Sequence, residues 1–175
     1  MSQKTIVFCA FILLCCAFFL NACAAPPAAK TLADRIQLAG ERSSSDAFTP
    51  HFSATRNGRR EDAIRLVAPV AVRTGLSGLS GKYALEALVT PVFDIGDGLQ
   101  LDIFIFTGGE RRQACQRYFD PARIASDRQW IPLAVPFELA GQSDSYLEIQ
   151  LSGGPQGDLT ADWLALAQIR ISKLR

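Results

Sequence analysis

The segment "LQLDIFIF", residues 99–106, decides the fold because its aliphatic residues recur at every second position. The repeating aliphatic face consists of Leu99, Leu101, Ile103 and Ile105. A period of two places successive side chains on opposite faces of an extended chain, whereas a helix needs a period near 3.6. The alternation therefore predicts a β-strand with one face against a core.

Seven further segments have strand-like patterns and are separated by turn signals. They are residues 47–55, 62–74, 82–93, 112–119, 128–139, 145–152 and 163–172. Asn57-Gly58 and Gly108-Gly109 favour tight turns, because these residues tolerate positive φ angles. Pro132 and Pro136 restrict the 128–139 strand to a sheet edge or a bulge, since proline has no N–H to donate.

Two segments also predict which side chains share a face. In residues 145–152 the buried face is predicted to be Leu147, Ile149 and Leu151, and the outward face Tyr146, Glu148 and Gln150. In residues 163–172, one face is predicted to hold Trp163, Ile169 and Ile171.

About eight short strands, with no long helices alternating between them, indicate an all-β, antiparallel β-sandwich of the jelly-roll type. Residues 47–175 are assigned to this domain. Residues 23–46 precede it as a tether, in which one or two helical turns are expected around Leu32, Ile36 and Leu38.

The first 22 residues have the features of a cleaved signal peptide. Lys4 precedes an apolar run over residues 6–20, which is 15 residues long. A helix that spans a bilayer needs roughly 20 apolar residues, so the run is short for a membrane span. A positive start, a short apolar middle and small residues at the exit are typical of export signals.

The sequence Leu20-Asn21-Ala22-Cys23 resembles the lipobox of bacterial lipoproteins. The resemblance implies that Cys23 becomes the N-terminus and carries diacylglycerol, whose two chains suffice for stable anchoring. Ala24, where an Asp would imply retention at the inner membrane, implies the outer membrane of a bacterial envelope. Two alternatives stay open: ordinary signal-peptidase cleavage that releases a soluble protein, and an uncleaved membrane anchor.

Charge and cysteine content limit the possible partners. Lys4 is the only charged residue in 1–22, so 17 of the 18 basic residues remain beside 17 acidic ones. This balance gives no electrostatic reason to expect a nucleic-acid partner. The local exception, residues 56–60, is either a solvated turn or a contact for an anion or polysaccharide. Cys115 is the one cysteine of residues 47–175, so no disulfide is expected within the domain.

Residues 94–172 resemble the galactose-binding-like β-sandwich of discoidin-type and carbohydrate-binding modules. The matching motifs are Gly96-Asp97-Gly98, Asp127-Arg128-Gln129-Trp130, Ala140-Gly141 and Asp162-Trp163. The resemblance implies a binding module rather than an enzyme. In keeping with this, the sequence has neither a G-x-S-x-G nor an H-E-x-x-H motif, and its one histidine, His51, has no identifiable partner.

Two sets of residues in these motifs have alternative interpretations. Trp130 and Trp163 either fill the space between the sheets or serve as platforms on which a sugar stacks. Asp94, Asp97 and Asp158 either cap turns or bind a structural calcium ion, since hard cations prefer carboxylate oxygens. No other cofactor is expected.

The leading hypothesis is a lipid-anchored envelope protein whose domain binds a glycan or an envelope partner without catalysis. The expected ligand-binding residues are Arg111, Arg112, Gln113, Gln156 and Asp158, in two loops predicted to meet at one end of the sandwich. The alternatives are a structural subunit that docks a protein through an exposed strand edge and a carbohydrate-active hydrolase.

Overall fold

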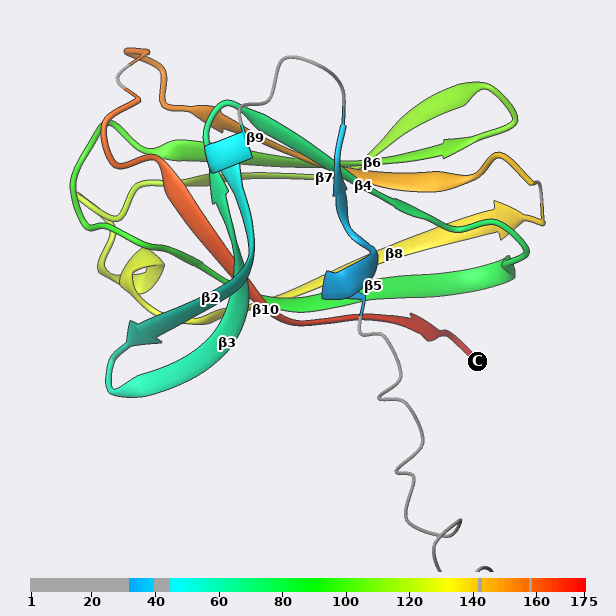
Figure 1. Ribbon diagram of the computed structural model, residues 1–175, viewed down its shortest axis with the longest axis horizontal. Coiled ribbons are helices and arrows are strands. Elements are labelled where there is room, and N and C mark those ends of the chain that lie inside the picture. The colour runs from blue at the N-terminus through cyan, green and yellow to red at the C-terminus, as the bar shows by residue number, and fades with distance from the viewer. Residues whose placement is uncertain (1–31, 40–44, 142, 158) are drawn as a thin grey trace, which may run out of the picture.

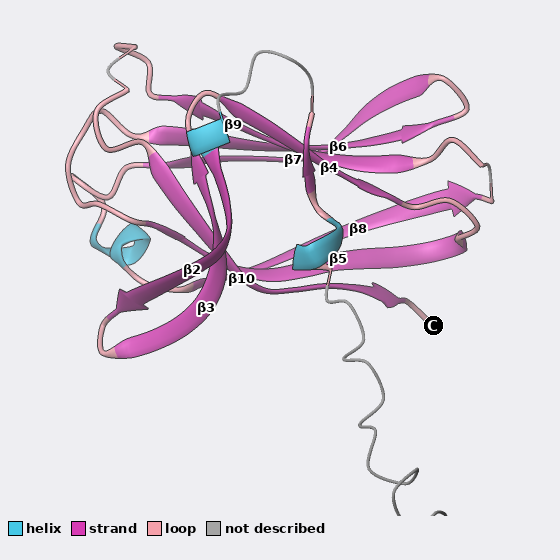
Figure 2. Cartoon of the chain, viewed as in Figure 1, coloured by secondary structure: helices cyan, strands magenta, loops and turns pink. Residues whose placement is uncertain are grey.

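The computed structural model describes residues 32–39, 45–141, 143–157 and 159–175, which form two antiparallel five-stranded sheets packed face to face (Figures 1 and 2). Sheet A has the order β1 (Gln37–Leu38), β4 (Val70–Gly75), β9 (Tyr146–Gly153), β6 (Leu99–Thr107) and β7 (Glu110–Phe119). Sheet B has the order β2 (Phe48–Arg56), β3 (Arg59–Val67), β10 (Trp163–Lys173), β5 (Ser80–Pro91) and β8 (Ile131–Ala140).

The helices of the described residues are three short 3₁₀ turns: η1 (Ala33–Arg35), η2 (Ser45–Ala47) and η3 (Ala125–Arg128). None of them has the length and apolar character that crossing a bilayer requires. The prediction of an all-β antiparallel sandwich is confirmed. Residues 36–38, within the predicted tether, contact the sandwich, because Ile36 is buried in the core and β1 pairs with β4.

Strand β6 forms the centre of the core, as its alternation predicts. Leu99, Leu101, Ile103 and Ile105 are each at most 2% exposed. In the ladder, Ile103 lies opposite Ile149 of β9, so the apolar faces of both strands point towards sheet B. The predicted buried face of residues 145–152 is therefore confirmed.

The segment 62–74 is not one strand as expected, but two strands in different sheets. β3 belongs to sheet B and β4 to sheet A, and the chain passes between them at Ala68 and Pro69. Pro69 has no N–H for a ladder, so an uninterrupted central strand cannot run through this position. This crossing and the short β1 raise the described strand number from about eight to ten.

A bulge in β10 makes one face prediction wrong. The register shifts between Ala167 and Arg170, and Gln168 has a φ of +53°. An extra residue in a strand exchanges the faces of everything that follows it. Ile169 and Ile171 therefore pack against the core between the sheets, whereas Trp163 lies on the outer face of sheet B.

Trp130 is buried, but not between the two sheets as the core interpretation assumed. It packs on the outer face of sheet B against small residues, Ala54, Ala63, Ala165 and Ala167. Its Nε1 donates a hydrogen bond of 3.1 Å to the carbonyl of Arg59, at the tip of the β2–β3 hairpin. Trp130 thus fixes this hairpin against the sheet and satisfies its own polar atom.

Two local predictions, one of a turn and one of a sheet edge, can be compared with the structure. Asn57 and Gly58 have φ angles of +48° and +73° in the β2–β3 turn, as expected. β8, with its two prolines, is one of the two edge strands of sheet B, also as expected. Cys115 is half-buried on β7, and this burial raises the pKa of its thiol.

Gly98 lies in the turn just before β6, where another strand approaches its backbone closely. Gly98 has a φ of +96°, and a Cβ there would lie 2.6 Å from the carbonyl oxygen of Phe119 and nearer still to the Tyr118 hydroxyl. Tyr118 also donates a hydrogen bond to the carbonyl of Asp97. A side chain at position 98 would therefore displace the strand that β6 pairs with.

We expect Gly98→Ala to lower the free energy of unfolding by about 2–4 kcal/mol, through backbone strain and the clash together. Gly109→Ala is the matched control, because Gly109 has a φ of +79° but nothing within 4 Å of an added Cβ. Its cost should be about 1–2 kcal/mol, from strain alone. Urea denaturation of the two variants measures the difference, and equal losses would contradict the clash.

Candidate functional site

The outer face of sheet A carries a group of aromatic side chains on its central strands. Phe104 and Phe106 project from β6, and Tyr146 projects from β9. Phe106 is paired with Tyr146 in the ladder, and their rings stack with centroids 4.3 Å apart and 13° between the planes. All three are partly exposed, because they lie on the face opposite the core.

Two arginines lie over these rings. The Arg111 guanidinium is 3.5 Å from the ring centre of Phe104, and that of Arg73 is 4.8 Å from the ring centre of Tyr146. Both arginines also approach Phe106, at 5.7 and 5.9 Å. Such cation–π contacts hold long, flexible side chains in one place.

Glu148 lies beneath the arginines and links them. Its Oε2 accepts a 2.5 Å hydrogen bond from Arg73 Nε, and its Oε1 accepts one of 2.6 Å from Gln150 Nε2. Arg111 Nη2 lies 3.7 Å from the same Oε1. Glu148 faces outward as predicted but is only 2% exposed, because these partners cover it. The hydrogen bond from Arg73 to the Glu148 carboxylate raises the pKa of this arginine.

A second carboxylate, Asp102, orders the amides on the neighbouring part of the face. Asp102 Oδ2 accepts a 2.8 Å hydrogen bond from Gln100, and its Oδ1 accepts one of 2.7 Å from Gln113. The ladder places Gln150 beside Asp102 on one side and Gln116 on the other. A row of carboxamides is thereby held across three strands.

We call this surface the platform and define it by its ten residues. They are Arg73, Gln100, Asp102, Phe104, Phe106, Arg111, Gln113, Tyr146, Glu148 and Gln150. Its two arginines are balanced by its two carboxylates, so the platform has no net charge. It combines aromatic carbon with amides whose orientation is fixed, which suits a ligand that has both apolar faces and many hydroxyl groups.

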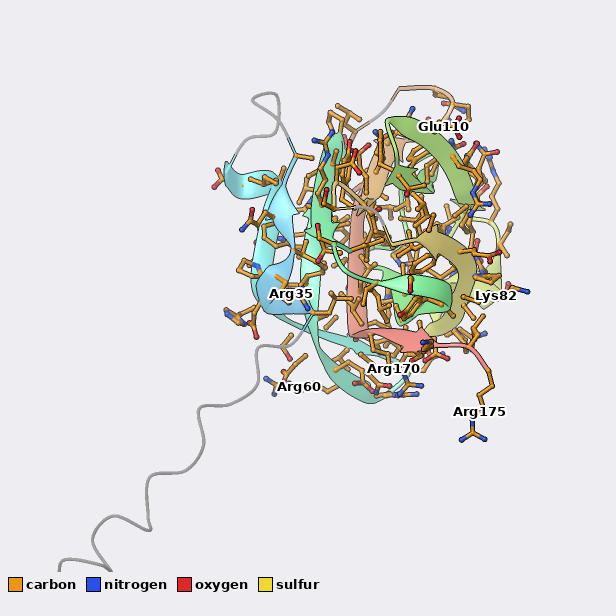
Figure 3. The ribbon with its side chains drawn as sticks, turned by 90° about the vertical axis from the view of Figure 1, so that its right-hand side faces the viewer. Arg35, Arg60, Lys82, Glu110, Arg170 and Arg175 are labelled. Atoms are coloured by element: carbon orange, nitrogen blue, oxygen red, sulfur yellow. The ribbon has the colours of Figure 1, made fainter. Side chains whose placement is uncertain are left out.

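The residues predicted from the sequence do not gather at one site. Arg111 and Gln113 belong to the platform, but Arg112 lies on the opposite face of β7 and lines a cleft of about 350 Å³ with Lys82 and Glu138. Figure 3 labels Lys82 of β5 and Glu110 of β7 in the right-hand half of its view.

Gln156 lies far from Arg111. In the β6–β9 ladder, Phe106 is opposite Tyr146 and Leu99 is opposite Gly153, so β9 separates the two loops that were expected to meet. Figure 1 shows the β6–β7 turn at the right and the β9–β10 loop at the upper left. The expectation that both loops share one end of the sandwich is therefore wrong, and Asp158 lies outside the described residues.

The platform contains residues that the sequence prediction missed. Phe104 and Phe106 occupy outward positions of the strand whose alternation decided the fold. Large aromatic residues on the solvent side of a strand were a usable signal. The role of Arg73 could not be predicted from the sequence, because β4 and β9 are more than 70 residues apart in the chain.

The aspartates proposed for calcium have other partners in the structure. Asp94 Oδ1 forms a 2.8 Å ion pair with Arg56, and Asp97 Oδ2 accepts a 2.6 Å hydrogen bond from the backbone N–H of Gln156. Asp97 Oδ1 is buried without a partner, yet no three acidic, histidine or cysteine side chains are grouped for a metal among the described residues. Asp94 and Asp97 therefore do not form a calcium site with the described residues, and Asp158, the third candidate, lies outside them, so we derive no chemistry from such a site.

Comparison with solved structures supports the fold. The CBM22-1 xylan-binding domain of Paenibacillus barcinonensis Xyn10C is 11% identical, with a TM-score of 0.52 over 81% of this chain and 87% of that chain. TmCBM61, solved in complex with β-1,4-galactotriose, is 11% identical, with a TM-score of 0.50 over 79% and 88% of the two chains. No protein-family model and no curated protein matches the sequence.

Other matches are to chains much longer than this one. The CBM22-1 and GH10 modules of Clostridium thermocellum Xyn10B, complexed with xylohexaose, match at 10% identity and a TM-score of 0.51, over 81% of this chain and 26% of that one. The chain spans only 12% of Clostridium perfringens ZmpB, solved with its M60 catalytic and CBM51 domains, at 14% identity, 71% coverage of this chain and a TM-score of 0.43. The likeness to the three structures with TM-scores of 0.50 to 0.52 shows the sandwich fold.

We expect Glu148→Ala to lower the free energy of unfolding by about 1–2 kcal/mol, because Arg73 and Gln150 would lose their shared acceptor. This is less than for a fully buried pair, since the Arg73 side chain is 48% exposed. Glu86→Ala is the control, because its pair with Arg170 is on the surface and should have little effect. Thermal unfolding measures the stability of the two variants. A Glu148→Ala variant as stable as the unsubstituted protein would show that Glu148 does not order the platform.

Proposed function

We propose that this domain binds a neutral polysaccharide on the platform, without cleaving it. The observation that carries the proposal is the stacked pair of Phe106 and Tyr146, flanked by amides and guanidinium groups that two carboxylates hold in place. The platform is the outer face of a sheet, so a long chain molecule can lie across it.

The chemistry of sugars fits such a surface. A pyranose ring has an apolar face of C–H groups, which packs against aromatic carbon, and hydroxyl groups around its rim. Those hydroxyls can donate to Asp102 and accept from the spare N–H groups of Gln100 and Gln113. Because these side chains are already ordered in the free protein, binding costs less conformational entropy.

The comparisons support the choice of ligand class. Two of the similar modules are described with xylan or xylohexaose, and a third with β-1,4-galactotriose. These are uncharged β-linked sugars, and the platform itself has no net charge. Xylan and β-1,4-galactan are therefore the first polysaccharides to test.

We further propose that the domain is held at a bacterial outer membrane through a lipid on Cys23. This proposal is supported by the lipobox-like sequence Leu20-Asn21-Ala22-Cys23. The residues that would carry the anchor lie outside the described part of the chain. A tethered binding domain would keep a polysaccharide close to the cell surface.

Binding to the platform predicts that Tyr146→Ala and Arg111→Ala each weaken affinity for the bound polysaccharide by about 5–30-fold, equivalent to about 1–2 kcal/mol. Arg112→Ala is the matched control, because Arg112 is the next residue and lies on the other face of β7. Affinity electrophoresis in xylan and β-1,4-galactan gels measures the change.

Three results of this experiment would count against the proposal. An equal loss with Arg112→Ala would move the site away from the platform. Absence of retardation in any neutral polysaccharide gel would remove the glycan ligand. Release of new reducing ends from the polysaccharide would replace binding with hydrolysis.

The anchor predicts that cells expressing the full chain incorporate labelled palmitate into it, and that Cys23→Ala abolishes the label. Membrane fractions should then lose the protein, because a single residue carries the whole attachment. Cys16→Ala, a leader cysteine outside the lipobox-like sequence, should keep both the label and the membrane location. Undiminished labelling of Cys23→Ala would exclude lipidation at this residue.

A further inference from the structure

The outer face of sheet B, opposite the platform, holds an arginine between aromatic rings. The Arg65 guanidinium is 4.5 Å from the ring centre of Trp163 and 5.6 Å from that of Phe52. Phe93 contacts Trp163 edge-on, with centroids 5.0 Å apart. Arg65 is half-buried, so the rings replace much of its water.

The hydrogen-bonding groups of Arg65 are largely unused. Its Nε is buried without a partner, and its Nη2 reaches only the backbone carbonyl of Asp46, at 3.5 Å. Arg56, on the neighbouring strand, instead has a carboxylate of Asp94 at 2.8 Å. The contacts that the structure gives Arg65 are two rings and one weak carbonyl, and none of them carries a negative charge.

Arg65 and Trp163 also line a cavity of about 460 Å³, together with Asp46 and the corner at residues 67–69. Ligand pockets have volumes of about 300–1,000 Å³, so this one has room for a sugar of one or two rings. The corner contributes Val67, Ala68 and Pro69, which make its wall apolar.

A cation that is partly removed from water is costly unless a negative group pairs with it. The five N–H groups of a guanidinium match the two oxygens of a carboxylate in a planar fork. We propose that this cavity is a second ligand site, which binds the carboxylate of an acidic sugar through Arg65 while the apolar wall receives the sugar ring.

Asp46 is the one acidic side chain that lines the cavity, and it opposes such a ligand. It is exposed, and its carboxylate does not form an ion pair with Arg65. The charge of Asp46 can therefore be used to distinguish an acidic ligand from a neutral one. For an acidic ligand, removing this charge strengthens binding, whereas a neutral sugar that uses Asp46 as an acceptor would bind more weakly.

The second site is independent of the platform, because the two lie on opposite outer faces of the sandwich. They also differ in charge, since the platform is balanced and this cavity contains a cation without a counter-ion among its contacts. Binding of an acidic sugar in this cavity goes beyond binding of a neutral polysaccharide on the platform, and either proposal can be wrong while the other holds.

The experiment titrates the full chain, solubilised in detergent, with D-glucuronate and with D-glucose, and follows the two tryptophan indole N–H resonances. Glucuronate should shift the Trp163 resonance, which is identified because it disappears in Trp163→Phe. The Trp130 resonance should stay unchanged, since its indole N–H is hydrogen-bonded to the carbonyl of Arg59. Glucose should shift neither resonance. Raising the salt concentration should weaken the glucuronate response, because salt screens an ion pair that is only partly buried.

Four variants complete the test. Arg65→Gln should lower glucuronate affinity at least tenfold, and Asp46→Asn should raise it two- to fivefold. Arg60→Gln, an exposed arginine of the same strand, and Tyr146→Ala of the platform should change nothing. Equal responses to glucose and glucuronate would overturn the proposal. So would weaker glucuronate binding in Asp46→Asn, which remains decisive even if Arg65→Gln does not fold.

Discussion

The alternation of side chains along β6 is the constraint on which the rest of the molecule depends. Its inward residues are almost wholly excluded from water, and they meet β9 and sheet B in one continuous core. Its outward residues, Phe104 and Phe106, therefore have to face solvent. One strand thus supplies the centre of the core and the centre of the platform, and a shift of one residue in its register would exchange them.

Features that depend on a few neighbouring residues could be predicted from the sequence. The period of β6, the Asn57-Gly58 turn and the edge position of β8 are of this kind. The bulge at Gln168 could not be predicted, because it depends on how β10 fits two neighbours that are distant in the chain. The burial of Trp130 on the outer face of sheet B likewise depends on contact with the β2–β3 hairpin, whose Arg59 is 71 residues away in the sequence.

The candidate site shows the same division. Arg111 and Gln113 were identified because their residue types suit polar recognition, but only the strand order shows what accompanies them. Glu148 gathers Arg73 from β4, while Asp102 gathers Gln113 from β7. Glu148 thus holds a side chain from 75 residues away, and Phe106 stacks on Tyr146 of a strand that is distant in the sequence. The predicted cluster with Gln156 failed for the same reason, since β9 runs between the two loops.

The prolines of β8 affect how such a domain behaves at high local concentration. Pro132 and Pro136 lie opposite Leu88 and Ala84 of β5, at positions of the same parity. Their nitrogens face away from β5, because a proline facing it would interrupt the ladder. An incoming strand would find two hydrogen-bond donors missing along this edge. Sheet B is therefore protected on this side against edge-to-edge aggregation, even when many copies are crowded together.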